Sequence, residues 1–503
     1  MPLLMGIDLG TSSVKVIVMD EDGAIRTIAR RDYPVDVPAD GHAQQEPLAW
    51  WNATADAIAE AVAAPGVDAA AIAGVGLSGQ MHGCVLADEQ GEALGPAIIH
   101  SDQRSWPQVR ALYERVGAET IHRATWNALY PGFQLASLAW VLEHTPALYE
   151  QARWVLAPKD YVRMKLTGAA AADHSDACAT GAYDMNSRQW AGEILTKAGL
   201  DPAKMPPIGE SADVGGGVSA VAARRTGLRP GTPVVLGGGD QPMQALGNGV
   251  IGPGTLTSTI GTAGQVFLPL AQSRPAGDLR THTFYGLERG MTYAMGAILS
   301  AGVCLKWLNG RVLGYSSFEE LDREAAAVPV GCHDLLFLPY LSGDRVPFGA
   351  YRLKASFVGL TLQHDRAAMA RAVLEGVVLA MRAKLDTLLT VEPVGRVIAS
   401  GGGAGSALWR QIQADVYGRE LYRTAMSEQA GVGAAMTAGV GVGAYGSYQQ
   451  ACDAVVRLDD RPVEPNPAVA AQYQEQFLRF REAVRRSAIG DDGKAVDVPR
   501  EVL

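Results

Sequence analysis

The stretch Met5-Gly6-Ile7-Asp8-Leu9-Gly10-Thr11-Ser12-Ser13-Val14-Lys15 joins an apolar strand to a short turn. Asp8 is a single carboxylate inside the strand, and the turn offers a glycine, three hydroxyl groups and a lysine. A charge inside a strand is unfavourable unless it has a partner. Two interpretations fit this stretch alone. It is either a phosphate site, in which Asp8 holds a hydrated magnesium ion, or a capped hairpin turn, in which Asp8 satisfies nearby amides.

The size and composition of the chain predict a globular protein with two domains. It has 503 residues, which is more than one hydrophobic core usually supports. The net charge of -10 argues against a nucleic-acid binder. The five cysteines are far apart and lack C-x-x-C spacing, so we expect buried thiols and neither a zinc site nor disulfides. The first apolar run has no basic segment before it, which argues against a secretory signal and favours a cytoplasmic protein.

One segment has to be weighed as a membrane span. Residues 430–445 are apolar, but the run is shorter than a span requires and is interrupted by glycines. We therefore expect a tightly packed interior helix here and no contact with a membrane.

The order of the predicted elements is that of an α/β protein. Short β-branched runs predict strands within residues 3–35, apolar spacing predicts a helix over 47–64, and a short strand follows at 75–77. Strands and helices that alternate in this way are typical of an α/β domain. The amphipathic pattern over 467–486 predicts a terminal helix.

The second half of the chain repeats motifs of the first. Leu256–Gly264 resembles the opening turn, and Val397–Gly403 resembles Val75–Gly79. We interpret these pairs as two related domains. The cluster Gly252-Pro253-Gly254 breaks regular structure between them, which predicts domains over 1–252 and 253–487 and a polar tail over 488–503.

A second carboxylate follows a glycine-rich strand end. In Val234–Pro242, an apolar strand ends in three glycines and then presents Asp240 at the start of a predicted helix. Asp240 could be a helix cap alone. Because capping rarely requires three preceding glycines, we favour a catalytic base that takes the proton of an attacking hydroxyl.

Two polar turns complete the candidates. Ser78–Gly83 ends a strand with Met81 and His82, and His82 can donate or accept at neutral pH. A lone histidine in a turn is more often structural, so on its own it is a weak ligand candidate. His100–Arg104 also follows an apolar strand, where α/β proteins tend to bind ligands, and an ordinary surface turn is the alternative.

At these residues the chain resembles the FGGY carbohydrate kinases, from Asp8 to about Phe480. The matching segments, in chain order, are Ile7–Ser12 as a first phosphate loop, Ser78–Gly83 as a sugar-contacting turn, Gly239–Gln241 around the catalytic base, Ile260–Gly264 as a second phosphate loop, Leu338–Arg345 near the nucleotide, and Ser400–Ala404 as an adenosine-binding turn. Six ordered matches are more specific than any one of them. Departures at His100, Ser137, Gln241 and Ala368 bear on the sugar more than on the chemistry.

The resemblance implies two actin-like ATPase domains of the ribonuclease H type, with a cleft between them that holds ATP and Mg²⁺. It implies an ATP-dependent kinase of a ketopentose, with the 5-hydroxyl of D-xylulose as the expected acceptor. Asp240 would be the general base and Asp8 the metal-side carboxylate. The substrate-binding residues would be Met81, His82, Asp240 and Gln241. The phosphates and the adenosine would be bound by Gly10, Thr11, Ser12, Lys15, Gly261, Thr262, Gly402, Gly403 and Ala404.

Two alternatives stay open at this point. The acceptor could be another ketose, a polyol or gluconate, because relatives in the same family use these sugars. The chain could also be a non-catalytic ATP-dependent clamp of the actin and heat-shock chaperone type, which would leave Asp240 and the Met81-His82 pair without a role. The family also implies a possible homodimer.

Overall fold

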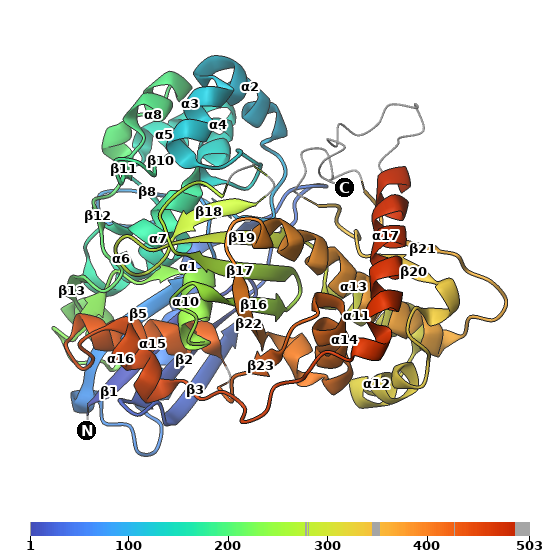
Figure 1. Ribbon diagram of the computed structural model, residues 1–503. Helices are drawn as coiled ribbons and strands as arrows, with labels where there is room; N and C mark the ends of the chain where they lie inside the picture. The colour runs from blue at the N-terminus through green and yellow to red at the C-terminus, as the bar shows by residue number, and fades with distance from the viewer. Residues whose placement is uncertain (1, 277–278, 280, 345–352, 427, 488–503) are drawn as a thin grey trace. The chain divides into compact units, whose positions relative to one another are not determined.

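The computed structural model describes residues 2–276, 279, 281–344, 353–426 and 428–487 (Figure 1). Two compact units can be distinguished by their internal contacts. The first unit is the chain up to Ile251, together with Thr283–Thr292 and Met426–Val456. The second unit contains Gly252–His282, Tyr293–Ala425 and the chain from Arg457 onward. The predicted tail over 488–503 and Arg345 of the predicted nucleotide segment lie outside the described residues.

The first unit is built on a mixed sheet with the strand order β13-β14-β5-β1-β2-β3. The bounds are β1 Leu3–Leu9, β2 Ser13–Asp20, β3 Ile25–Asp32, β5 Ile72–Gly79, β13 Val214–Gly217 and β14 Pro233–Val235. β1 and β2 form an antiparallel hairpin, and β5 runs parallel to β1 with Ser78 opposite Asp8. The short β15 (Gly238–Gly239) extends the sheet at the end of β5.

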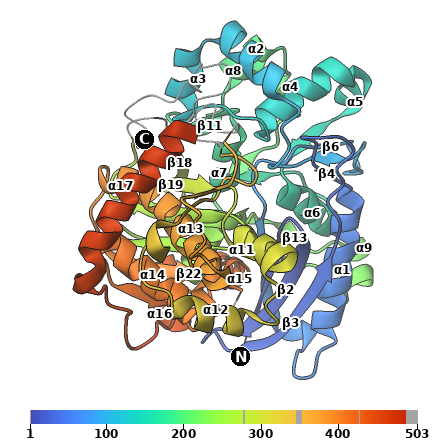
Figure 2. The same cartoon turned by 90° about the vertical axis from the view of Figure 1, so that its right-hand side faces the viewer.

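Helices of the first unit pack on this sheet, and several others form a group at one end of the unit. α1 (Pro47–Val62) packs against β2 and β3, as Figure 2 shows. The helices α2, α3, α4, α5 and α8 lie together at one end of the first unit (Figure 1). Their bounds are Trp106–Val116, Ala118–Thr125, Gln134–His144, Pro146–Gln151 and Gly192–Ala198. Further helices of this unit are α6 Pro158–Thr167, α7 His174–Ala177, α9 Ala220–Thr226, α10 Asp240–Gly247 and α16 Tyr448–Val455.

The second unit repeats the central part of this topology. Its sheet contains the order β19-β17-β16-β22-β23, with β16 Gly254–Ile260, β17 Gly264–Leu270, β19 Thr292–Ile298, β22 Val394–Ser400 and β23 Leu421–Arg423. β16 and β17 form an antiparallel hairpin, and β22 runs parallel to β16 with Ser400 opposite Thr259. A hairpin whose first strand has a parallel partner therefore occurs in both units. The internal repeat predicted from the sequence is confirmed.

Helices of different lengths pack with the sheet in the core of the second unit. They are α11 Gly302–Leu308, α12 Phe318–Ala326, α13 Arg366–Leu389, α14 Ala407–Tyr417 and α17 Ala470–Ser487. α13 lies beside α17 in both views (Figures 1 and 2), and the hydroxyl of Tyr473 donates to Glu375 between them. α17 confirms the predicted terminal helix.

The glycine-rich segment near residue 430 returns to the first unit as α15 (Gln429–Gly441). Glycines on both sides allow backbone contact, since a Cβ on Gly6 would meet the carbonyl oxygen of Gly431 at 1.9 Å. A Cβ on Gly76 would meet the oxygen of Ala434 at 2.0 Å. α15 is thus the packed interior helix that the sequence predicts. Among the described residues, no helix has both the length and the apolar character that crossing a bilayer requires.

All five cysteines are free and buried, as the sequence predicts. The strand, helix and hairpin predictions for the first 80 residues are confirmed as well, with β1, β2, β3, α1 and β5 in the expected order.

Candidate active site

Asp8 lies near the end of β1, in the first unit, and keeps part of its surface accessible to solvent. The hydroxyl of Ser78 on the parallel strand β5 donates to Asp8 Oδ1 at 3.0 Å. The pKa of Asp8 is raised, first by burial, while the hydrogen bond from Ser78 and the charge of Lys15 oppose the rise. A carboxylate in this setting is surrounded by protein yet reachable, which suits a ligand-facing group.

The hairpin turn after Asp8 is held by its main chain. The Gly10 amide donates to Ser13 at 3.0 Å, and the hydroxyl of Tyr33 donates to the Gly10 carbonyl at 2.5 Å. The side-chain amide of Gln45 donates to the Thr11 carbonyl at 2.8 Å. Ser12 is exposed, so its hydroxyl can meet a ligand. The structure therefore contains the hairpin of one interpretation, and it leaves Ser12 of the phosphate interpretation exposed.

Lys15 has a partner that the sequence did not indicate. It lies opposite Asp8 in the hairpin and forms an ion pair with Glu428, which precedes α15. Glu428 has a left-handed backbone (φ 58°) and contributes to the raised pKa of Asp8. Glu428 is far away in sequence, and no spacing rule connects it to the opening turn.

Asp240 is the first residue of α10 and follows directly on β15. Gly237 takes a left-handed conformation (φ 78°), in which a Cβ would approach the Leu77 carbonyl to 2.2 Å. The turn therefore requires glycine there. Burial, followed by the charge of Asp8, raises the pKa of Asp240 to about 7. The two predicted catalytic carboxylates are thus electrostatic neighbours within the first unit.

The predicted sugar turn lies beside Asp240. A Cβ on Gly239 would come within 2.9 Å of the sulfur of Met81, so the Met81 side chain packs on the strand end that carries Asp240. His82 has a left-handed backbone (φ 72°), which is uncommon for residues other than glycine and is found more often at functional sites. Its ring stacks on Phe133 at 4.4 Å, and its Nδ1 lies 2.6 Å from the Ala179 carbonyl oxygen. Met81 and His82 are both buried, and Gln241 is partly exposed.

The remaining predicted residues come together in the second unit. The Gly261 amide donates to the Ala263 carbonyl at 2.9 Å in the β16–β17 turn, and Thr262 is exposed. Gly401 is left-handed (φ 75°), and a Cβ there would meet the Ile260 carbonyl oxygen at 2.6 Å. Gly402–Gly405 then form a single 3₁₀ turn before α14. Gly261, Thr262, Gly402, Gly403 and Ala404 therefore lie on adjoining turns at the ends of β16 and β22.

The residues of the first unit offer oxygen ligands of the kind that Mg²⁺ prefers. The described residues contain no cluster of three or more His, Cys, Asp or Glu side chains fit to hold a metal. Mg²⁺ usually uses one or two carboxylates, waters and substrate phosphates instead of a complete protein cage. Asp8, with one oxygen bound by Ser78, fits that requirement.

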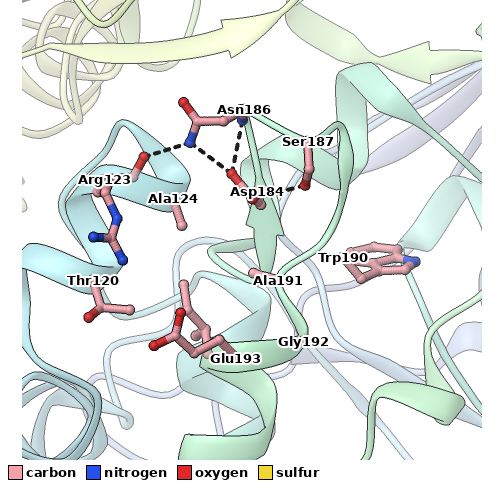
Figure 3. Close-up of a pocket in the computed structure, with 11 residues that line it drawn as sticks. Thr120, Arg123, Ala124, Asp184, Asn186, Ser187, Trp190, Ala191, Gly192 and Glu193 are labelled. Atoms are coloured by element: carbon pink, nitrogen blue, oxygen red, sulfur yellow. Dashed lines mark hydrogen bonds between the residues drawn. The ribbon is translucent and has the colours of Figure 1, made fainter.

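A polar hollow on the first unit lies apart from these residues. It has a volume of about 580 Å³ and is lined by residues of α3 and of the segment from β10 (Tyr183–Asp184) through β11 (Gln189–Trp190) into α8. Figure 3 shows that Asn186 and Ser187 donate to the carboxylate of Asp184 there, so this acid is already engaged. None of the predicted site residues lines the hollow.

The chain matches the models of both domains of the FGGY family of carbohydrate kinases, the N-terminal domain over residues 3–247 and the C-terminal domain over 256–442. It is 32% identical to a xylulose kinase of Bacillus subtilis (strain 168), over 91% of this chain and 92% of that protein. It is 27% identical to a gluconokinase of the same organism, over 90% of each chain. The crystal structure of xylulose kinase from Rhodospirillum rubrum superposes with a TM-score of 0.86, at 30% identity over 96% of this chain and 98% of that one.

Proposed function

Because the chain belongs to the FGGY family of carbohydrate kinases, we propose that it transfers the γ-phosphoryl group of ATP to the 5-hydroxyl of D-xylulose. The full-length similarity to xylulose kinases supports this acceptor over the other sugars. The main observation in favour of this reaction is the setting of Asp240. Its carboxylate follows a glycine-rich strand end, lies near the charge of Asp8 and has a pKa of about 7.

Asp240 is suited to act as the general base. A base works best when its pKa is near the operating pH, because it is then ionised and still holds a proton firmly. In the proposed step, Asp240 accepts the proton of the sugar hydroxyl as that oxygen attacks the γ-phosphorus. The new O–P bond forms while the bond from the γ-phosphorus to the bridging oxygen breaks, and ADP leaves. Such base catalysis contributes roughly 10²- to 10⁴-fold.

Met81, His82 and Gln241 are proposed to hold the sugar. The stack on Phe133 and the contact with the Ala179 carbonyl fix the ring of His82, which leaves little side-chain freedom to lose on binding. A neutral ring whose Nδ1 donates to that carbonyl has Nε2 as its acceptor nitrogen. A polyhydroxy substrate supplies hydroxyl donors for such an acceptor.

The nucleotide is proposed to bind to the turns that repeat between the units. The hydroxyls of Thr11 and Ser12 in the first unit and of Thr262 in the second would donate to phosphate oxygens, while Gly10 and Gly261 would let the phosphates approach the main chain closely. Gly402, Gly403 and Ala404 would adjoin the adenosine, where the small residues permit close approach. Lys15 is proposed to act on phosphate as a charge whose position is set by Glu428.

Asp8 is proposed to hold Mg²⁺ through its water shell, and the ion when bound would neutralise phosphate charge. Asp8 would supply the carboxylate oxygens, and Ser78 holds one of them by its hydrogen bond. Without the ion, the charge of Asp8 raises the pKa of Asp240.

The proposal is tested by an ATP-coupled assay with D-xylulose, D-ribulose, L-ribulose, xylitol, glycerol and D-gluconate as acceptors. We expect the highest kcat/KM with D-xylulose, and ¹H–³¹P NMR of the product should place the phosphate on carbon 5. A higher kcat/KM with any other acceptor would contradict the proposed substrate, and the similarity to gluconokinase makes gluconate the sharpest competitor.

Asp240→Asn tests the base. We expect kcat to fall at least ~100-fold while ATP still binds, since the amide cannot accept the proton. Asp56→Asn is the matched control, because Asp56 is exposed and forms an ion pair with Arg225 at the surface. Wild-type turnover in Asp240→Asn would refute the base. Nucleotide binding without any sugar phosphorylation in the wild-type protein would favour the ATP-dependent clamp.

A further inference from the structure

A buried ionic cluster lies behind the strand end that carries Asp240. Lys159 of α6 is fully buried, and its Nζ lies 2.5 Å from Asp160, 2.8 Å from Asp173 and 3.6 Å from Asp176. We call these four residues the Lys159 cluster. Burial disfavours the charge of Lys159, yet the three carboxylates outweigh it and raise the pKa of the lysine. The removal of such charges from water is unfavourable unless close ion pairs and further hydrogen bonds compensate for it.

One hydroxyl connects this cluster to the candidate base. Ser175 donates to Asp173 Oδ2 at 2.5 Å, and its oxygen accepts the Gly239 amide at 3.1 Å. A serine hydroxyl has one proton to donate and two lone pairs to accept with, so both bonds form together. Gly239 is the residue before Asp240 and the N-cap of α10.

The bond is strengthened by the charges behind it. Asp173 Oδ1 faces the ammonium of Lys159, while Oδ2 accepts from the hydroxyl of Ser175. A hydroxyl that donates to an ionised carboxylate becomes a better acceptor, because consecutive hydrogen bonds polarise one another. These interactions therefore form a cooperative series. It runs from Lys159 through Asp173 and Ser175 to the Gly239 amide, one residue before the proposed base.

Packing shows that the contact is tight. A Cβ on Gly238 would come within 2.8 Å of the Ser175 oxygen, so only glycine allows the hydroxyl to reach this strand. On the neighbouring strand, a Cβ on Gly79 would come within 2.7 Å of the Cβ of Lys159. The two glycine-rich turns of the site thus lie directly against the cluster.

We propose that Ser175 is a positioning residue for Asp240, held in place by Asp173 and Lys159. The inference rests on the proposed function for its catalytic consequence. Ser175 fixes the peptide between Gly238 and Gly239 and thereby sets where the carboxylate of Asp240 points. A displacement of about 1 Å at a reacting group can lower the rate ~100-fold, so the loss of this one hydrogen bond can lower kcat.

The chain offers a matched control. Ser211 also donates to Asp173 Oδ2, at 2.9 Å, and is equally buried, but its hydroxyl is not bonded to Gly239. Ser175→Ala and Ser211→Ala therefore remove the same kind of bond from the same carboxylate. Only Ser175→Ala also leaves the Gly239 amide unpaired.

The first measurement does not depend on the substrate. We expect hydrogen–deuterium exchange at the Gly239 amide to accelerate in Ser175→Ala and to stay at the wild-type rate in Ser211→Ala. Equal exchange in the two variants would overturn the link. This readout decides the inference even if no sugar in the panel is phosphorylated, in which case the proposed function alone fails.

The second measurement is kinetic. We expect Ser175→Ala to lower kcat by about 10- to 100-fold relative to Ser211→Ala, with KM for ATP changed by less than about twofold. An equal loss in both variants, or an equal rise of KM for ATP, would assign Ser175 a merely structural role. If Ser175→Ala does not fold, Ser175→Thr, which keeps the hydroxyl, should exceed Ser175→Cys in kcat. The reverse order would contradict the proposal.

Discussion

Asp240→Asn should make the protein more stable at alkaline pH while it removes the proposed base. The folded-state pKa of Asp240 is about 7, against an ordinary value of 3.8, and burial is the main cause. An acid whose pKa is raised on folding contributes stability that is complete below its unfolded pKa and is lost as pH rises through its folded pKa. The stability contributed by Asp240 is therefore lost between about pH 4 and about pH 7. The side-chain amide of Asp240→Asn does not titrate, so the variant does not lose it.

The magnitude follows from the shift. At about 1.36 kcal/mol per pKa unit, the wild-type protein loses about 2 kcal/mol of stability at pH 5, where Asp240 ionises only in the unfolded chain, and about 4 kcal/mol at pH 8. These are upper values, because Asp240 keeps part of its surface in solvent, where charges are screened. Since 1 kcal/mol shifts a large domain by ~2 °C, the variant should gain up to about 8 °C at pH 8.

The assay is thermal unfolding of the wild-type protein, Asp240→Asn and the surface control Asp56→Asn at pH 5, 6.5 and 8. We expect the advantage of Asp240→Asn to grow with pH, and Asp56→Asn to follow the wild-type protein. An advantage that does not change with pH would trace the effect to shape or hydrogen bonding instead of charge. A wild-type protein that is as stable as Asp240→Asn at pH 8 would refute the raised pKa itself.

Three other changes test the site and its support. Asp8→Asn should lower kcat by at least ~100-fold and, in the protein without Mg²⁺, lower the pKa of Asp240. The pKa falls because the charge of Asp8 helps to raise it, but it should stay above the ordinary value of 3.8, since burial is the larger cause. The pH dependence of thermal unfolding without Mg²⁺ checks this. Gly76→Ala should lower the free energy of unfolding by about 1–3 kcal/mol, because its Cβ would meet a carbonyl oxygen of α15 at 2.0 Å. Chemical denaturation checks this against Gly252→Ala, whose Cβ meets nothing within 4 Å, and equal losses would contradict the packing argument. His82→Ala should raise KM for the sugar by about tenfold through loss of a hydrogen bond and leave KM for ATP unchanged, and a selective rise in KM for ATP would place His82 at the nucleotide instead.

The repeated hairpins could be predicted from the sequence because residues close together in the chain define them. Apolar runs with short glycine turns define β1 with β2 and β16 with β17, and the period of two fixes which side chains face inward. Asp8 and Asp240 were recognisable for a related reason. Each is a charge placed at a strand where burial makes it unfavourable, so its presence signals a specific partner.

The residues that contact Asp8 and Lys15 could not be predicted from the sequence. Ser78 lies opposite Asp8 only because β5 pairs parallel to β1, a contact that spans 70 residues. Glu428 reaches Lys15 from 413 residues away. The left-handed backbone of His82 could not be predicted from the sequence, because only a few per cent of residues other than glycine adopt it.

By itself, the sequence determined the α/β class, the internal repeat, the buried thiols and the two carboxylates, since each follows from periodicity, turn chemistry or the energetic cost of a buried charge. Only the tertiary structure decided that α15 packs between backbone atoms of the first unit and that Ser175 connects the Lys159 cluster to the amide before Asp240. Those contacts depend on how strands and helices far apart in the chain are brought within a few ångströms. Hydrogen bonds and close packing act only over such distances, so local sequence patterns carry no record of them.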